Sequence, residues 1–145
     1  MRHRWKWSAL ATVLITWTSA GFAHPGFLGI PTTEPDDWKA PPNEGQKENP
    51  VPADKQSTEA GKVVYTQQCL ICHGTTGKGD GPAAAALPRK PDDLADPRTR
   101  AQTDGALFWK ITTGKAPMPS YEKLLTDRQR WDAVNYVRTL EPKKK

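Results

Sequence analysis

The sequence has little cysteine and no long apolar segment. Only 2 of its 145 residues are Cys, so a small domain built around several disulfides is excluded. No run of about 20 uninterrupted apolar residues is present, which argues against a channel or transporter made of spanning helices. No segment alternates apolar and polar residues as a half-buried β-strand does. A chain of this length supports one compact domain.

Residues 1–23 have the composition of a secretory signal peptide. Basic residues lie within the first six positions, a short apolar stretch follows over 9–17, and small residues lead up to Ala23. This order is typical of an export signal. We therefore expect cleavage after Ala23 and a periplasmic protein. An uncleaved membrane anchor is the alternative, although the apolar stretch is short for spanning a bilayer.

The rest of the chain divides near residue 57. Residues 24–56 contain seven prolines and show no apolar period, so they cannot join a helix or central strand over any length. We interpret them as a Pro-rich linker. An extended arm, with residues 27–38 packed on the domain or on a partner, is the alternative. Residues 57–145 form the predicted domain.

Three helices are predicted in this domain, each beginning at a residue that can cap a helix. Long loops rich in Gly and Pro separate them, so the predicted fold is all-α. Three short helices cannot bury a large core, and a bound group must therefore fill the centre. The expected helices run from Ser57 or Thr58 into Cys69, from the cap Asp104 to near Gly114, and from Thr126 or Asp127 to just before Pro142.

The motif Cys69-Leu70-Ile71-Cys72-His73 is the attachment signature of c-type haem. Two thiols three positions apart near a helix end can each add to one vinyl group of the same porphyrin. The imidazole of His73 then projects toward the iron. We therefore predict one covalently attached haem c, with Cys69 and Cys72 as thioethers and His73 as an axial ligand.

Other interpretations of the motif fit the sequence less well. A thioredoxin-like dithiol would follow a strand in a βαβ context, which is absent. A zinc site needs four ligands, and outside the motif the expected mature chain offers only His24 as a further His or Cys donor. No structural zinc is therefore expected. A chance occurrence of the pattern is the remaining alternative.

Met118 is the candidate for the second iron ligand. It is the only methionine besides the initiator, and it lies between Pro117 and Pro119 in a predicted loop. Such a loop can present the thioether rigidly. A Met ligand stabilises ferrous iron and raises the reduction potential relative to bis-histidine ligation, which suits an electron carrier. We rank Met118 above His24, a lysine, or an open coordination position.

Residues 57–141 resemble the class I cytochrome c family, especially its small exported bacterial domains. The resemblance implies the cytochrome c fold, with short helices wrapped around one haem. It also implies that Gly61 and Tyr65 pack against the last helix. In Gly81-Pro82, the carbonyl of Pro82 would accept a hydrogen bond from His73.

The sequence favours a one-electron carrier over an enzyme. No side chains form a catalytic constellation, and an iron with both axial positions filled cannot bind substrate. We expect redox proteins of the membrane or periplasm as electron donor and acceptor. A subunit docked on a periplasmic dehydrogenase or reductase through residues 24–56 is the alternative. A gas sensor or peroxidase-like protein with an open iron ranks third.

The positive charge is unevenly distributed. The formal net charge is +5, but residues 1–23 carry three basic groups and no acidic one. Residues 24–60 hold 3 basic against 7 acidic groups, and residues 61–145 hold 15 against 9. A basic domain behind an acidic segment predicts steering toward an acidic patch on a redox partner. Binding to nucleic acid is not expected.

Overall fold

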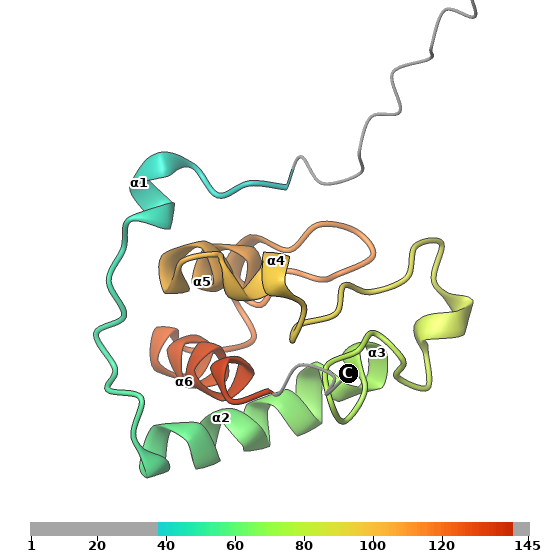
Figure 1. Cartoon of the computed structure of the whole chain (residues 1–145), viewed down its shortest axis with the longest axis horizontal. Helices are drawn as coiled ribbons and strands as arrows, with labels where there is room; N and C mark the ends of the chain where they lie inside the picture. The colour runs from blue at the N-terminus through green and yellow to red at the C-terminus, as the bar shows by residue number, and fades with distance from the viewer. Residues whose placement is uncertain (1–37, 141–145) are drawn as a thin grey trace, which may run out of the picture. The chain divides into compact units, whose positions relative to one another are not determined.

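The computed structural model describes residues 38–140 of the protein. The expected signal peptide and cleavage site lie outside these residues, as do His24 and Pro142. Within the described part the chain is all-α and forms no β-strand, as predicted, and none of its helices is long and apolar enough to cross a membrane. Its helices are α1 (Pro42–Gly45), α2 (Lys55–Gln68), α3 (Leu70–His73), the 3-10 turn η1 (Ala84–Ala86), α4 (Pro97–Arg100), α5 (Asp104–Thr113) and α6 (Asp127–Arg138) (Figure 1).

The three longer helices are the three that the sequence predicts, with two differences at their first residues. Asp54, not Ser57 or Thr58, caps α2: its carboxylate accepts a hydrogen bond of 2.8 Å from the Ser57 backbone. The Ser57 side chain is buried and bonded to α6 instead. For α5 the cap is Thr103 rather than Asp104.

The ends of α5 and α6 agree with the sequence. Helix α5 stops at Gly114, whose φ of 64° lies in the left-handed region that favours glycine. Helix α6 begins after Thr126, which forms a capping box with Gln129: each side chain bonds to the backbone N–H of the other residue. Local signals alone are sufficient to define these two boundaries.

Helices α2 and α6 pack against each other more closely than ordinary side chains would allow. A β-carbon on Gly61 would overlap the carbonyl oxygen of Asp132 and lie 2.9 Å from Cβ of Tyr136. One turn further along, the rings of Tyr65 and Tyr136 pack with centroids 5.1 Å apart. The expected roles of Gly61 and Tyr65 are therefore confirmed.

One apolar cluster of the core lies between α5 and α6. Phe108 of α5 stacks on Trp131 of α6 with ring centroids 4.0 Å apart and an angle of 14° between the planes. Val134 in the same cluster is fully buried. The other two buried members of this cluster are Leu107 of α5 and Val51, which precedes α2 in the sequence.

Residues 38–54 pack on the domain, and we call them the N-terminal arm. For residues 38–54 the structure therefore differs from the preferred interpretation of a linker. The alternative concerned packing of residues 27–38, of which only Trp38 belongs to the described part. Residues 24–37 lie outside the described part. Regular secondary structure in the arm is limited to the single turn of α1. Prolines keep longer helices from forming here, but they do not prevent the segment from being held by side chains of the other helices.

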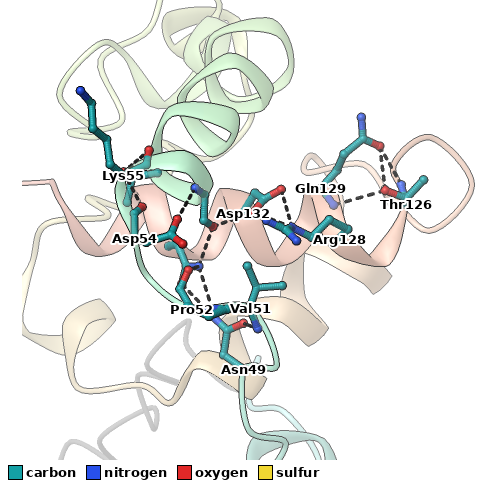
Figure 2. A network of polar contacts seen from close by, with 12 residues as sticks. Asn49, Val51, Pro52, Asp54, Lys55, Thr126, Arg128, Gln129 and Asp132 are labelled. Atoms are coloured by element: carbon teal, nitrogen blue, oxygen red, sulfur yellow. Dashed lines mark hydrogen bonds and ion pairs between the residues drawn. The ribbon is translucent and has the colours of Figure 1, made fainter.

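A buried polar network fastens the arm to α2 and α6 (Figure 2). Asn135 donates to the hydroxyl of Ser57 at 2.8 Å and to the carbonyl of Val51 at 3.1 Å. The Ser57 hydroxyl in turn donates to the carboxylate of Asp132 at 2.6 Å. Because buried polar groups are costly when unpaired, these bonds specify how the arm and the two helices fit together.

Candidate haem-binding site

The C-x-x-C-H motif forms one helical turn directly after α2. The backbone N–H groups of Cys72 and His73 both donate to the carbonyl of Cys69, at 3.1 and 2.9 Å. The motif therefore presents both sulfur atoms and the imidazole from a single turn. Both cysteines are free thiols and partly buried, so they are available for bonds to a porphyrin rather than to each other.

Burial favours the uncharged forms of two side chains of the motif, Cys69 and His73. Burial, with a smaller contribution from the neighbouring Cys72, raises the pKa of the Cys69 thiol to about 12. Burial also lowers the pKa of His73, against the opposing effect of its contact with Asp92. A neutral imidazole is the form that binds a metal.

The Nδ1 atom of His73 lies 3.2 Å from the backbone carbonyl oxygen of Asp92. Since a carbonyl can only accept, this contact makes Nδ1 the protonated nitrogen and leaves the lone pair of Nε2 for a metal. The resemblance to the cytochrome c family implied Pro82 as this acceptor. The structure gives the role to Asp92, which follows the motif by 19 residues.

The loop that contains Pro82 makes other contacts in the structure. The N–H of Gly81 donates to the carbonyl of Cys72 at 3.1 Å, and that of Ala83 donates to Ile71 at 2.9 Å. These bonds fold the Gly81-Pro82 segment back onto the backbone of α3, and Pro82 itself is exposed. The loop thus supports the motif from its backbone side.

Two adjoining cavities, of about 70 and 90 Å³, lie next to the motif and open to solvent. The structure brings Met118 to the same cavities as Cys69 and His73, although 45 residues separate Met118 from His73 in the sequence. The residues that line both cavities are Trp38, Cys69, His73, Asp92 and Met118; Cys72 lines the first.

The donor set at these cavities fits a covalently held haem. Two thiols can form thioethers, and a neutral imidazole and a thioether sulfur can bind iron. The remaining walls are largely aliphatic and aromatic, with Tyr65, Leu94, Leu107 and Val137 among the residues that line the second cavity. A planar, mostly apolar macrocycle would supply the centre that the short helices leave unfilled.

The loop that carries Met118 is tightly folded. Lys115 and Met118 exchange two backbone hydrogen bonds of 3.0 and 2.9 Å. The hydroxyl of Ser120 donates to the carbonyl of Thr112 at 2.6 Å, which returns the chain to the end of α5. Met118 itself packs against a buried cluster that includes Tyr121. The loop is therefore rigid, as its flanking prolines predict.

Sequence reasoning missed two residues at the cavity, Trp38 and Asp92. Asp92 acts through a backbone carbonyl, so no side-chain signal could reveal it. Trp38 was considered only as part of the alternative in which the arm packs on the domain. Three basic residues, Arg89, Lys90 and Lys115, also line the first cavity, and their clustering becomes visible only in the folded chain.

Comparison with known proteins places these features in a family. The family model described as cytochrome C oxidase, cbb3-type, subunit III matches residues 56–137. Cytochrome c6 of Rippkaea orientalis is 34% identical over 87 residues, which cover 59% of this chain and 73% of that protein. The segment that the family model matches does not include the N-terminal arm.

Solved structures give the same relationship. A chain of the Kuenenia stuttgartiensis reducing HAO-like protein complex Kustc0457/Kustc0458 superposes with a TM-score of 0.57 and 33% identity, over 64% of this chain and 47% of that one. This chain thus spans about half the length of that relative. The KustC0563 c-type cytochrome superposes with a TM-score of 0.50 and 25% identity, over 57% of this chain and 98% of that one.

These matches, the C-x-x-C-H turn and the cavity beside it agree. The fold is the cytochrome c fold, and members of this family carry covalently attached haem c and transfer electrons. The chain belongs to the cytochrome c family.

Proposed function

We propose that this protein is an exported cytochrome c that carries one electron at a time on a single haem. Cys69 and Cys72 would form its thioethers, and His73 and Met118 would be the axial ligands of its iron. The observation that carries this proposal is that His73 and Met118 line the same two cavities. When bound, the haem supplies a one-electron Fe(II)/Fe(III) couple.

The residues around His73 prepare it as a ligand. Its Nδ1–H donates to the carbonyl of Asp92, which fixes the tautomer, orients the ring and increases the basicity of the other nitrogen. The loop from which Asp92 comes is itself tied down, because the N–H of Leu94 donates to the carbonyl of Gly77 at 2.7 Å. The imidazole is thus held in a fixed orientation.

Met118 is prepared in the same way by its folded loop. Because the loop is already ordered, binding through the thioether requires little further loss of conformational entropy. A thioether ligand also favours the ferrous state. If His73 and Met118 both bound the iron, no coordination position would be left for a substrate, which favours an electron carrier over an enzyme.

The rim of the first cavity supports docking to acidic redox partners. Arg89, Lys90 and Lys115 lie there, and Arg89 is also 3.7 Å from Asp92. A cluster of cationic side chains at the mouth of a redox site attracts negatively charged surfaces and raises association rates at low salt. The partners would be electron donors and acceptors of the membrane or periplasm.

A subunit role within a larger redox enzyme is the second candidate, and the similarity to a chain of an HAO-like protein complex favours it. Residues 24–56 were the expected docking element in that case. Since residues 38–54 pack on their own domain, docking would instead use the basic rim. Purification of the native protein from its host separates the two roles: a stable complex with an oxidoreductase supports the subunit, and a free monomer supports the carrier.

Replacement of Met118 tests the ligand assignment. The oxidised wild-type holoprotein should show the weak near-infrared band of a sulfur–iron bond, and Met118→Ala should abolish it and allow the ferrous protein to bind carbon monoxide rapidly. Lys123→Ala, at an exposed position outside both cavities, is the control and should keep the band. A band that survives in Met118→Ala would contradict the assignment. N-terminal sequencing of the periplasmic protein should begin at His24.

A further inference from the structure

Trp38 lines the cavities beside the haem-attachment motif, although it lies outside the segment that the family model matches. It lines both cavities together with His73 and Met118, whereas the family model begins at residue 56. The side chain is partly buried. An element that the family model does not include therefore contributes to the site where the cofactor of this protein would lie.

Helix α5 holds the Trp38 ring at the cavity. The ring lies 6.3 Å from that of Trp109, centroid to centroid, with 54° between the planes. The ammonium nitrogen of Lys110 lies 5.1 Å from the centroid of the Trp38 ring, within the range of a cation–π contact. These two neighbouring residues of α5 give the indole a defined position.

The first anchor of the arm behind Trp38 is the contact of α1 with the start of α5. The hydroxyl of Thr103 donates to the carbonyl of Gly45 at 2.6 Å. A β-carbon on Gly105 would overlap the carbonyl oxygen of Glu44 and lie 2.7 Å from that of Lys47. Gly105 thus allows the backbone of the arm to lie directly on α5.

The second anchor lies at the other end of the arm, next to α6. Asn49 donates to the side-chain oxygen of Asn135 at 2.7 Å, and Val51 is buried in the apolar core. Both anchors lie in residues other than Trp38. The arm would therefore keep its place if the indole were removed, and the role of the indole can be tested separately from that of the fold.

We propose that the N-terminal arm is a strap across the haem cavity, in which Trp38 closes the cavity against water and small ligands. This inference rests on the proposed function, because it requires a haem bound between His73 and Met118. A closed apolar shell around a metal site limits access of solvent and of competing ligands. The strap would thus protect the bond from Met118 to the iron.

Entry of imidazole into the oxidised holoprotein tests this proposal. Imidazole replaces the Met118 sulfur as a ligand without any change in oxidation state, and loss of the near-infrared sulfur–iron band measures its rate. We expect Trp38→Ala to accelerate the exchange by about tenfold and Trp38→Phe, which keeps an aromatic ring, by less than about threefold. Lys39→Ala, at an exposed neighbour that lines neither cavity, should leave the rate unchanged.

If Trp38→Ala accelerates imidazole exchange by less than threefold, the proposal that the arm is a strap would be overturned. If the wild-type protein shows no sulfur–iron band at all, the proposed ligation fails instead, so the two failures are distinguishable. A measurement on the unaltered protein gives a second test. The indole N–H resonance of Trp38 should shift more between the ferrous and ferric states than that of Trp131, which lies in the core and lines neither cavity. The reverse order would also overturn the proposal.

Discussion

The hydroxyl of Tyr121 donates a hydrogen bond of 2.9 Å to the backbone carbonyl of Gln68, the last residue of α2. Tyr121 follows the Met118 loop, and Gln68 directly precedes Cys69. A single phenol therefore joins the segment that carries the candidate Met ligand to the turn that carries the two thiols and His73. The residue is buried, and burial raises its pKa to about 12.

Replacement of Tyr121 by Phe should loosen this connection without creating a cavity. We expect the free energy of unfolding of the holoprotein at pH 7 to fall by about 1 kcal/mol, because the variant loses one hydrogen bond and leaves the Gln68 carbonyl without this donor. Denaturation in urea, followed by circular dichroism, measures the change. Tyr136→Phe, in which the ring contact with Tyr65 remains, is the matched control and should have a smaller effect.

The difference in unfolding free energy between the wild type and Tyr121→Phe should depend on pH. The ordinary pKa of tyrosine is 10.0, and in the folded protein that of Tyr121 is about 12. Its neutral form is therefore favoured by folding, and the stabilisation is fully present below pH 10 and is lost as the pH rises through 12. The difference in unfolding free energy between wild type and Tyr121→Phe should shrink across this range. A difference that stays constant from pH 8 to pH 12 would contradict this assignment.

Gly61 should be intolerant of even one added methyl group. Alanine normally stabilises a helix relative to glycine, by about 1 kcal/mol, but here its β-carbon would overlap the carbonyl oxygen of Asp132 in α6. We expect Gly61→Ala to lower the unfolding free energy by about 2 kcal/mol or more, since backbone must move to relieve the overlap. Thermal denaturation of the holoprotein measures this.

Gly45→Ala is the matched control for that substitution. A β-carbon on Gly45 would meet only the Thr103 hydroxyl oxygen, at 3.9 Å, which is an ordinary contact. We expect a change within about 0.5 kcal/mol. Equal effects of the two substitutions would mean that the close approach of α2 and α6 does not limit what residue 61 can be.

The polar network beneath the arm predicts a large effect of Asn135→Ala. Asn135 is 2% exposed and bonds to Asn49, Val51 and Ser57. Its removal would leave buried polar groups without partners, so we expect a loss of about 3 kcal/mol in unfolding free energy. The arm should also become more susceptible to proteolysis. Asn43→Ala, which loses only an exposed contact with Glu44, should change neither measurement.

Features encoded by short-range patterns could be predicted from the sequence. The capping box of Thr126 and Gln129, the end of α5 at Gly114 and the C-x-x-C-H turn all depend on residues within a few positions of one another. Gly61 and Tyr65 were found through the resemblance to a family, because their spacing from Cys69 is short and fixed. In each case residues within a short stretch of sequence are sufficient to predict the feature.

Features that depend on the approach of distant segments could not be predicted in the same way. The sequence placed the acceptor for His73 at Pro82, within a nearby motif, whereas the folded chain brings the carbonyl of Asp92 to the ring. The arm was judged by its prolines, which report backbone freedom but not tertiary contacts. Its attachment depends on Asn135, whose importance is visible only when its four partners, Asn49, Val51, Pro52 and Ser57, are in place.

The basic rim of the cavity predicts that electron transfer depends on the charge of the reaction partner. Lys90 and Lys115 line the first cavity, and they would attract an anion during its approach. We expect Lys90→Glu and Lys115→Glu to slow oxidation of the ferrous protein by ferricyanide, together by about tenfold at low ionic strength. Oxidation by a cationic cobalt complex should become faster in the same variants. Stopped-flow spectroscopy at several salt concentrations measures both rates.

The control for this experiment is Lys62→Glu, which makes the same change of charge at an exposed position of α2 that lines neither cavity. Lys62→Glu changes the net charge by the same amount as either single rim substitution, so it should alter both rates far less than Lys90→Glu or Lys115→Glu does if position matters. Salt should also reduce the difference between wild type and the rim variants, because the Debye length falls to about 8 Å at physiological ionic strength. If Lys62→Glu slows ferricyanide as much as Lys90→Glu does, net charge alone would explain the rates, and the rim would have no special role in docking.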